Sequence, residues 1–312
     1  MSIHDFRDFK HQAAETLSRV DGRRSVLISS GAAAIALFVV NLLTLLLDSG
    51  IANTGGLGGL GTRSLLSTAQ SVLSLGLSLL LPFWGLGLVC AMLKLSRGQI
   101  PEDATLLEGF RRFFPALRLM ILRGLVYICV CILCIQLVTP LLAMTPLAEP
   151  LLTLFSENPE LLYSMETLDE ATATAMTGAM LPILLICGAV CLIVLTPIFY
   201  SFRMADLRLM DDPKCGAIAA LTQSARMMKG NRLSLLKLDL SFFWYYLAQL
   251  LILVLCNLPL IVPLPMDANW SYLLFSTLGA AAEVALYYHA RCYVDVTYAK
   301  TYDHLKQLKM EH

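Results

Sequence analysis

The sequence predicts an all-α membrane protein: a polytopic bundle of six transmembrane helices, with both termini in the cytoplasm and amphipathic helices at the interface. Two observations predict this fold class. Hydrophobic residues make up 57% of the 312-residue chain and charged residues 15%, against roughly 45–50% and 25% in soluble domains. The apolar residues also gather into long runs near the about 20 residues that a helix needs to cross the hydrocarbon core. Backbone polar groups there need internal partners, so we expect these runs to be helices.

The six expected spans form a single membrane domain. They lie at about 25–47, 65–93, 117–144, 181–200, 240–262 and 270–288. Residues 1–24 are expected to form an amphipathic arm on the cytoplasmic side, and residues 289–312 a cytoplasmic tail. A signal peptide has a short basic start and an apolar region of about 7–15 residues. The polar arm and the first span are both longer, so we expect the first helix to be retained.

The orientation follows from the positions of the basic residues. Every Lys and Arg except Arg63 lies in the arm, in the tail, in the loops after the second and fourth spans, or, as Arg118 and Arg123 do, near the start of the third span. Since basic loops stay in the cytoplasm, both termini are expected there. The loop 145–180, which carries acidic residues and no basic ones, is expected outside. The net charge of zero therefore combines a basic cytoplasmic side with an acidic outer loop. We expect the basic side to bind anionic lipid headgroups and not nucleic acid.

Two amphipathic helices are expected in the cytoplasmic loops. One is predicted from Asp103, as its N-cap, to Phe114. The other is predicted to follow Asp212, to open at Pro213 and to end at Gly230, which suits a helix C-cap. The basic residues beside their apolar faces are the candidate contacts with a lipid or a protein partner: Arg111, Arg112, Arg226, Lys229 and Arg232.

Two polar features inside the spans are candidate sites. Glu283 is the one carboxylate well inside a span, where a charge is costly and a functional role is the default hypothesis. The structural alternative is a carboxylate that reaches toward the interface or pairs with Arg123 or Arg291. The second span carries serines on one helical face, which either pack against a neighbouring helix or line a polar pathway. These serines are Ser67, Ser71, Ser74 and Ser78.

The sequence shows no pattern that predicts catalysis, a cofactor or a metal site. The glycines of Gly56–Gly61 match the dinucleotide fingerprint, but they follow a membrane span instead of a β-strand, so we interpret them as a loop. The cysteines at 129, 131, 134, 187 and 191 have no His or carboxylate neighbours in their spans, and small buried apolar side chains are the better interpretation. We therefore expect no enzymatic activity.

A segment around the fifth span resembles the signature of a bacterial integral-membrane family, domain-of-unknown-function family 975. The residues that carry the resemblance are Asp211-Asp212-Pro213, Ser224–Arg232 and Leu238–Trp244. The resemblance is strongest over about 203–250 and weaker at Phe9–Arg24, Leu106–Phe114 and Tyr287–Tyr293. It implies a polytopic helical fold in a bacterial inner membrane, and it implies no activity.

Two functions from different classes fit these expectations. The leading one is a non-enzymatic scaffold or accessory subunit that binds lipid, a membrane-protein partner or a second copy through its cytoplasmic face. The alternative is a small-solute or ion transporter that uses the serine face and Glu283. A transporter needs a cavity that Glu283 or the serines line, whereas a scaffold needs an exposed basic or apolar cytoplasmic surface.

Overall fold

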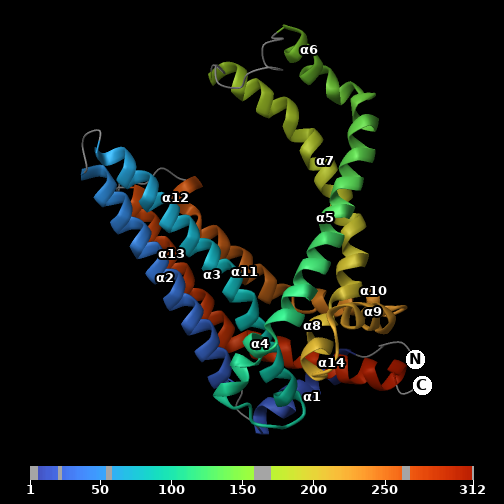
Figure 1. Ribbon diagram of the computed structural model, residues 1–312. Helices are drawn as coiled ribbons and strands as arrows, with labels where there is room; N and C mark the ends of the chain where they lie inside the picture. The colour runs from blue at the N-terminus through green and yellow to red at the C-terminus, as the bar shows by residue number, and fades with distance from the viewer. Residues whose placement is uncertain (1–5, 20–22, 54–57, 158–169, 262–267, 311–312) are drawn as a thin grey trace. The chain divides into compact units, whose positions relative to one another are not determined.

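A computed structural model shows helices and no strands wherever it describes the chain (Figure 1), which confirms the all-α prediction. The residues described are 6–19, 23–53, 58–157, 170–261 and 268–310. The chain forms two compact units. Unit 1 comprises Met1–Arg118 and Met204–His312, and unit 2 comprises Leu119–Arg203.

Unit 1 contains a group of apolar helices. They are α2 (Arg23–Asn53), α3 (Gly58–Ser96), α11 (Phe243–Cys256), the short α12 (Leu258–Ile261) and α13 (Ala268–Leu286). Helix α13 packs against both α2 and α11, and α2 also packs against α3 (Figure 1). The predicted glycine loop falls partly on residues 54–57, outside the described residues, and α3 already begins at Gly58.

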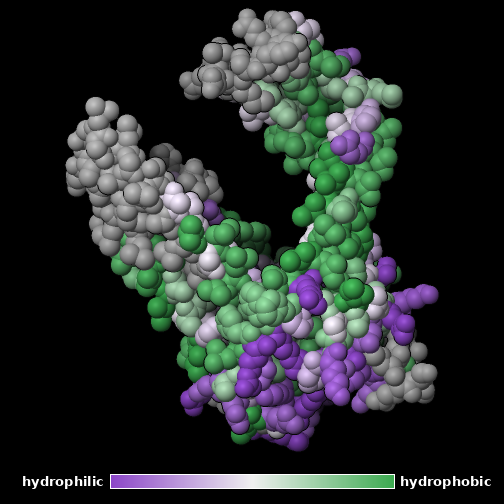
Figure 2. Space-filling model, viewed as in Figure 1, coloured by the Kyte–Doolittle hydropathy of each residue, from purple (hydrophilic) through white to green (hydrophobic). Residues whose placement is uncertain are grey.

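The hydrophilic side chains of unit 1 lie mainly at one end of the unit (Figure 2). This end, which we call the polar end, is built from α14 and several shorter helices. They are α1 (Phe6–Arg19), η1 (Asp103–Leu107), α4 (Glu108–Arg111), α8 (Ala205–Asp211), α9 (Ala217–Met228), α10 (Arg232–Leu240) and α14 (Cys292–Met310). The amphipathic arm α1 buries Phe9 and Ala13, and the Phe9 ring lies 5.2 Å from that of His304 on α14. The apolar face of the arm therefore packs on protein.

Unit 2 holds most of α5 (Phe113–Ala143) and all of η2 (Pro146–Ala148), α6 (Glu149–Glu157) and α7 (Glu170–Phe202). Large apolar side chains on α5 and α7 are exposed, for example Leu137 at 68% and Ile193 at 73%. Apolar surface on this scale marks contact with a membrane or a partner. The predicted outer loop 145–180 is helical on both sides of residues 158–169, which lie outside the described residues.

Over the part that the structure describes, four of the six predicted runs lie within one helix each, to within one residue at the ends. The run 240–262 is broken at residues 241–242 and at Asn257, between α10, α11 and α12, and the run 270–288 passes from α13 into a π-helical turn at Tyr287. By length and composition, three described helices can cross a membrane: Ser78–Ser96, Phe113–Ala143 and Thr174–Asp211. Two bent pairs raise this number to five if each pair counts as one span. One of them is α10 and α11, which meet at 65°. The helices are therefore those of a membrane protein, with three to five candidate spans among the described residues.

The helix ends correct two of the sequence predictions. Asp103 does not cap a helix through its side chain; it lies inside η1 and forms an ion pair with Arg24 at 2.9 Å. Pro213 does not open α9, because the Asp212 carboxylate accepts the Lys214 backbone N–H at 2.9 Å and holds a turn there, so that α9 begins at Ala217. Gly230 confirms its predicted place: it follows the C-cap of α9 with a φ of +85°, which glycine adopts without strain.

Candidate functional site

A cavity of about 210 Å³ lies between α2, α3 and the end of α13 in unit 1. Small side chains leave the space: Ala33 and Ala34 on α2, Gly85 on α3, and Ala280 on α13. The polar groups that line it come from α2, α3, α13 and the turn that follows α13. They are Ser29, Ser30, Trp84, Glu283, Tyr287 and Arg291.

The helix around Glu283 positions three of these groups on one face. Glu283, Tyr287 and Arg291 follow at intervals of four residues, which places them one above another. A single π-helical turn, Tyr287–Arg291, joins α13 to α14, and such turns are frequent at functional sites. Tyr287 lies one turn after Glu283 at the same cavity, and Gln249 on α11 donates to the Tyr287 hydroxyl at 3.4 Å.

Of the remaining polar groups at the cavity, some have hydrogen-bond or ion-pair partners and one has none among the described residues. Arg291, one of the two bases expected to pair with Glu283, forms its ion pair with Asp295 at 3.2 Å and lies 4.4 Å above the Tyr287 ring. Ser30 donates to the Val26 carbonyl at 2.8 Å. The buried indole N–H of Trp84 has no hydrogen-bond partner in the described part of the chain. The cavity therefore offers a carboxylate without a basic partner and an unused donor.

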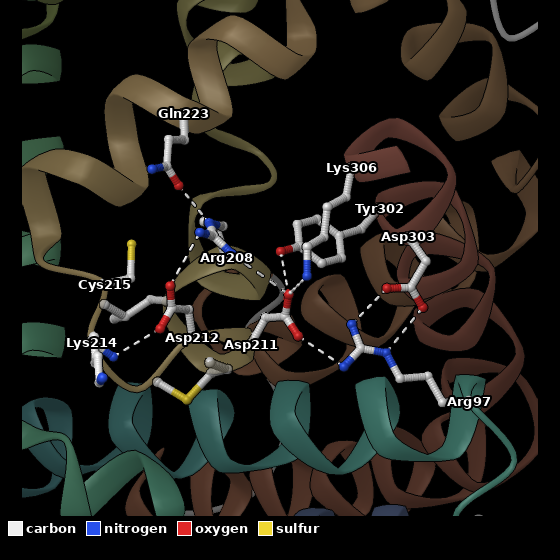
Figure 3. Close-up of polar contacts among 12 residues, drawn as sticks. Arg97, Arg208, Asp211, Asp212, Lys214, Cys215, Gln223, Tyr302, Asp303 and Lys306 are labelled. Atoms are coloured by element: carbon white, nitrogen blue, oxygen red, sulfur yellow. Dashed lines mark hydrogen bonds and ion pairs between the residues drawn. The ribbon is translucent and has the colours of Figure 1, made fainter. Parts of the chain in front are cut away.

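A second polar cluster holds the polar end together around Asp211 (Figure 3). The side chain of Asp211 on α8 is only 5% exposed. It accepts hydrogen bonds from Tyr302 and Lys306 on α14, each at 2.8 Å, and pairs with Arg97 at the end of α3 at 2.8 Å. Arg97 also donates two hydrogen bonds to the Asp303 carboxylate, at 2.7 and 3.3 Å. One carboxylate thus joins α3, α8 and α14.

Arg208 extends this cluster toward α9. Its guanidinium contacts Asp212 at 3.2 Å and Asp211 at 3.7 Å, and it donates to the side chain of Gln223. Because α8 carries three charged residues among seven, we place it beyond the apolar stretch 181–200 and outside the hydrocarbon core. The cluster fixes the helices of the polar end relative to one another, and none of its members reaches the cavity around Glu283.

The charge state of Asp211 reflects its neighbours. Burial alone would raise the pKa of this carboxyl, but hydrogen bonds from Lys306, Arg97 and Tyr302 outweigh burial and lower its pKa to about 2, from 3.8. Burial also raises the pKa of the Tyr302 hydroxyl, and the adjacent Asp211 carboxylate raises it further. At neutral pH Asp211 is therefore a carboxylate surrounded by a neutral phenol and three cations, two of which also pair with Asp303 and Asp212.

A basic groove of about 410 Å³ lies where α9 turns into α10. Lys229 and Arg232 line it together with Gly230, Ala225 and Leu233. Both basic side chains are exposed, and Leu233 is 73% exposed. The first backbone N–H groups of α10 begin at Arg232 with no side-chain cap, so the helix dipole adds to the positive charge.

The other predicted basic contacts lie elsewhere on unit 1. Arg226 is exposed on α9. Arg111 is exposed and pairs with Glu108 at 3.0 Å. Arg112 is half-buried and donates to the carbonyls of Leu209 and Met210 at 2.6 and 3.2 Å, so it closes the end of α8.

The serines of the second span do not gather at the cavity where the structure describes them. Ser71 and Ser78 are exposed on α3, and the side chains of Ser67 and Ser74 lie outside the described residues. The serines that do line the cavity, Ser29 and Ser30, lie near the start of α2. Sequence reasoning missed these two, along with Trp84 and the Asp211 cluster. Two adjacent serines near the basic end of the first span were the available signal.

The described residues contain no group of three or more His, Cys, Asp or Glu side chains arranged to hold a metal ion. Among known proteins, the family model described as "Protein of unknown function (DUF975)" matches residues 23–309. No curated protein and no solved structure matches the chain significantly. The match covers both units, including the cavity, the Asp211 cluster and the basic groove.

Proposed function

We propose that this chain, which belongs to the DUF975 family of proteins of unknown function, is a non-catalytic scaffold or accessory subunit of the bacterial inner membrane. It docks on anionic lipid headgroups through the basic groove at Lys229 and Arg232. The observation that carries this proposal is the composition of the groove: two exposed cations, a helix N-terminus and an exposed leucine. These are the groups that a phosphate and the first carbons of an acyl chain require.

The surroundings of the groove support a position at the membrane interface. Leu240, Phe243 and Trp244 are 62%, 54% and 78% exposed where α10 bends into α11. Tryptophan is enriched at the headgroup level, with its ring toward the hydrocarbon. An apolar belt directly after a basic turn supports a position of Lys229 and Arg232 at the height of the phosphates.

The transport alternative has less support. Of its named residues whose side chains the structure describes, Glu283 lines the cavity, while Ser71 and Ser78 do not. The geometry therefore does not favour a continuous polar pathway that joins the serine face to Glu283.

Removing the two groove cations tests the docking. Native mass spectrometry of the full-length protein in detergent, with phosphatidylglycerol or phosphatidylcholine added, should show preferential retention of phosphatidylglycerol. Each cation near anionic headgroups contributes about 1 kcal/mol, so the variant Lys229→Gln/Arg232→Gln should bind phosphatidylglycerol about 30-fold more weakly. The control Lys214→Gln/Lys237→Gln removes the same charge from exposed positions outside the groove. Equal weakening in both variants would contradict a specific groove.

We further propose six spans, with the polar end and both termini in the cytoplasm and the acidic segment within 145–180 outside. All Lys and Arg residues except Arg63 support this orientation. Alkaline phosphatase fused within 145–180 should be active, and a fluorescent protein fused after His312 should fluoresce in whole cells. Active phosphatase at the C-terminus would overturn the orientation.

A further inference from the structure

The polar groups of the Glu283 cavity do not satisfy one another. Among the described residues, the ion pair of Arg291 is with Asp295 and no basic side chain pairs with Glu283. The Tyr287 hydroxyl lines the same cavity, but it carries no charge and gives the carboxylate no counter-ion. A charge in the interior of a membrane protein is costly unless a partner of opposite charge compensates for it. The missing partner is a cation.

The second unsatisfied group demands an acceptor. The Trp84 indole N–H is buried at the cavity and has no partner among the described residues. A buried donor without an acceptor costs about 1–3 kcal/mol, and native proteins rarely leave one. A metal ion would satisfy the carboxylate but not this N–H. The occupant therefore needs both a cationic group and an oxygen acceptor.

The size of the cavity limits the occupant further. A volume of about 210 Å³ is below the roughly 300–1,000 Å³ of pockets for drug-sized ligands. It is about seven times the roughly 30 Å³ that one water molecule occupies in the liquid. The space fits a molecule or headgroup of a few heavy atoms, and is too large for a bare ion.

We propose that this cavity binds a small amine that carries an oxygen acceptor, of the amino-alcohol class. The ammonium group lies at the Glu283 carboxylate and the Tyr287 hydroxyl, and the oxygen accepts from the Trp84 N–H. Arg291 stands at the same wall, where it can meet the phosphate of an esterified amino alcohol. The site is separate from the basic groove, so its failure or success does not decide the headgroup docking proposed there.

Two sources supply this chemistry: a free amino alcohol and the headgroup of phosphatidylethanolamine. The cavity lies toward the polar end of its helices, because Ser29 is near the start of α2 and Arg291 follows the end of α13. Both sources can reach this level, and the experiment needs an arm for each.

The free-amine arm uses the full-length protein in detergent without phosphatidylethanolamine, titrated with ethanolamine while the thermal unfolding midpoint is followed. The wild type should gain stability, and Glu283→Gln, which keeps the shape of the side chain, should bind at least tenfold more weakly. Trp84→Phe keeps the carboxylate and should weaken binding about fivefold. Glu102→Gln, an exposed carboxylate outside the cavity, is the control and should match the wild type.

The lipid arm compares retention of phosphatidylethanolamine and phosphatidylglycerol in native mass spectra after reconstitution in an equal mixture of the two. Preferential retention of phosphatidylethanolamine, lost in Glu283→Gln, identifies the headgroup as the source. Ethanolamine binding without such retention identifies the free amine. A wild type that neither responds to ethanolamine nor retains phosphatidylethanolamine overturns the proposal, whatever the fate of the variants. So does an equal loss of binding in Glu102→Gln.

Discussion

Replacing Asp211 by Asn is expected to lower the free energy of unfolding by about 3 kcal/mol, measured by chemical denaturation in detergent micelles. The substitution keeps the size of the side chain and removes the one negative charge that Arg97, Lys306 and Arg208 share. Removing one partner of a buried ion pair typically costs about 3–5 kcal/mol. The lower end applies here, because Arg97 keeps Asp303 and the side chain of Lys306 is 36% exposed.

The control for this prediction is Asp103→Asn. Asp103 also pairs with an arginine, at 2.9 Å, but both side chains are largely exposed, and such pairs contribute about 0–1 kcal/mol. Equal losses in the two variants would show that burial of Asp211 contributes nothing.

Acid provides an independent measurement of the same contribution. The pKa of Asp211 is about 2 in the folded protein and near 3.8 when unpaired. A carboxylate whose pKa is lowered by folding stabilises the protein above its unfolded-state pKa, and this contribution disappears as the pH falls through the folded-state value. The difference between wild type and Asp211→Asn should therefore be constant above about pH 5 and shrink toward pH 2. A constant difference down to pH 2 would contradict the assignment.

The helices could be predicted from the sequence because their signal is local and strong. A run of about 20 apolar residues, as at 181–200, requires a helix in the membrane whatever the rest of the chain does. The same holds for Glu283: a lone carboxylate in an apolar run stands out, and the structure places it at a cavity. Gly230 was predictable as well, because glycine is favoured where a helix ends with a positive φ.

The Asp211 cluster could not be predicted, because its members come from three separate segments. Arg97, Asp211 and Lys306 look like ordinary charges beside their spans, and only the packing of α3, α8 and α14 joins them. The cavity could not be predicted for the same reason. Trp84 on α3 and Ser30 on α2 line it together with Glu283 only because α13 packs beside these helices. The helix starts at Asp103 and Pro213 failed for a different reason. Asp103 pairs with Arg24, which is distant in sequence, and Asp212 holds a turn at Lys214, and a local capping pattern predicts neither contact.

The backbone of α3 lies directly against the backbone of the segment 103–111. A Cβ added at Gly87 would lie 1.9 Å from the carbonyl oxygen of Leu106, and one added at Gly109 would lie 1.9 Å from that of Phe83. The two glycines thus let the chain cross at a separation that no other residue permits. This contact holds η1 and α4 against α3, and with them Arg112, which closes the end of α8.

Gly87→Ala is therefore expected to lower the free energy of unfolding by about 3 kcal/mol, the upper part of the range for overpacked cores. The obstacle is backbone, so the methyl group can be accommodated only if the segment 103–111 moves away from α3. Trypsin cleavage after Arg111, measured on the folded protein, should accelerate as the segment loosens. The control is Gly76→Ala on the same helix, where an added Cβ meets nothing within 4 Å. There the better helix propensity of alanine should leave stability unchanged or raise it slightly. Gly87→Ala with the stability and the cleavage rate of Gly76→Ala would show that this close contact does not position the polar end.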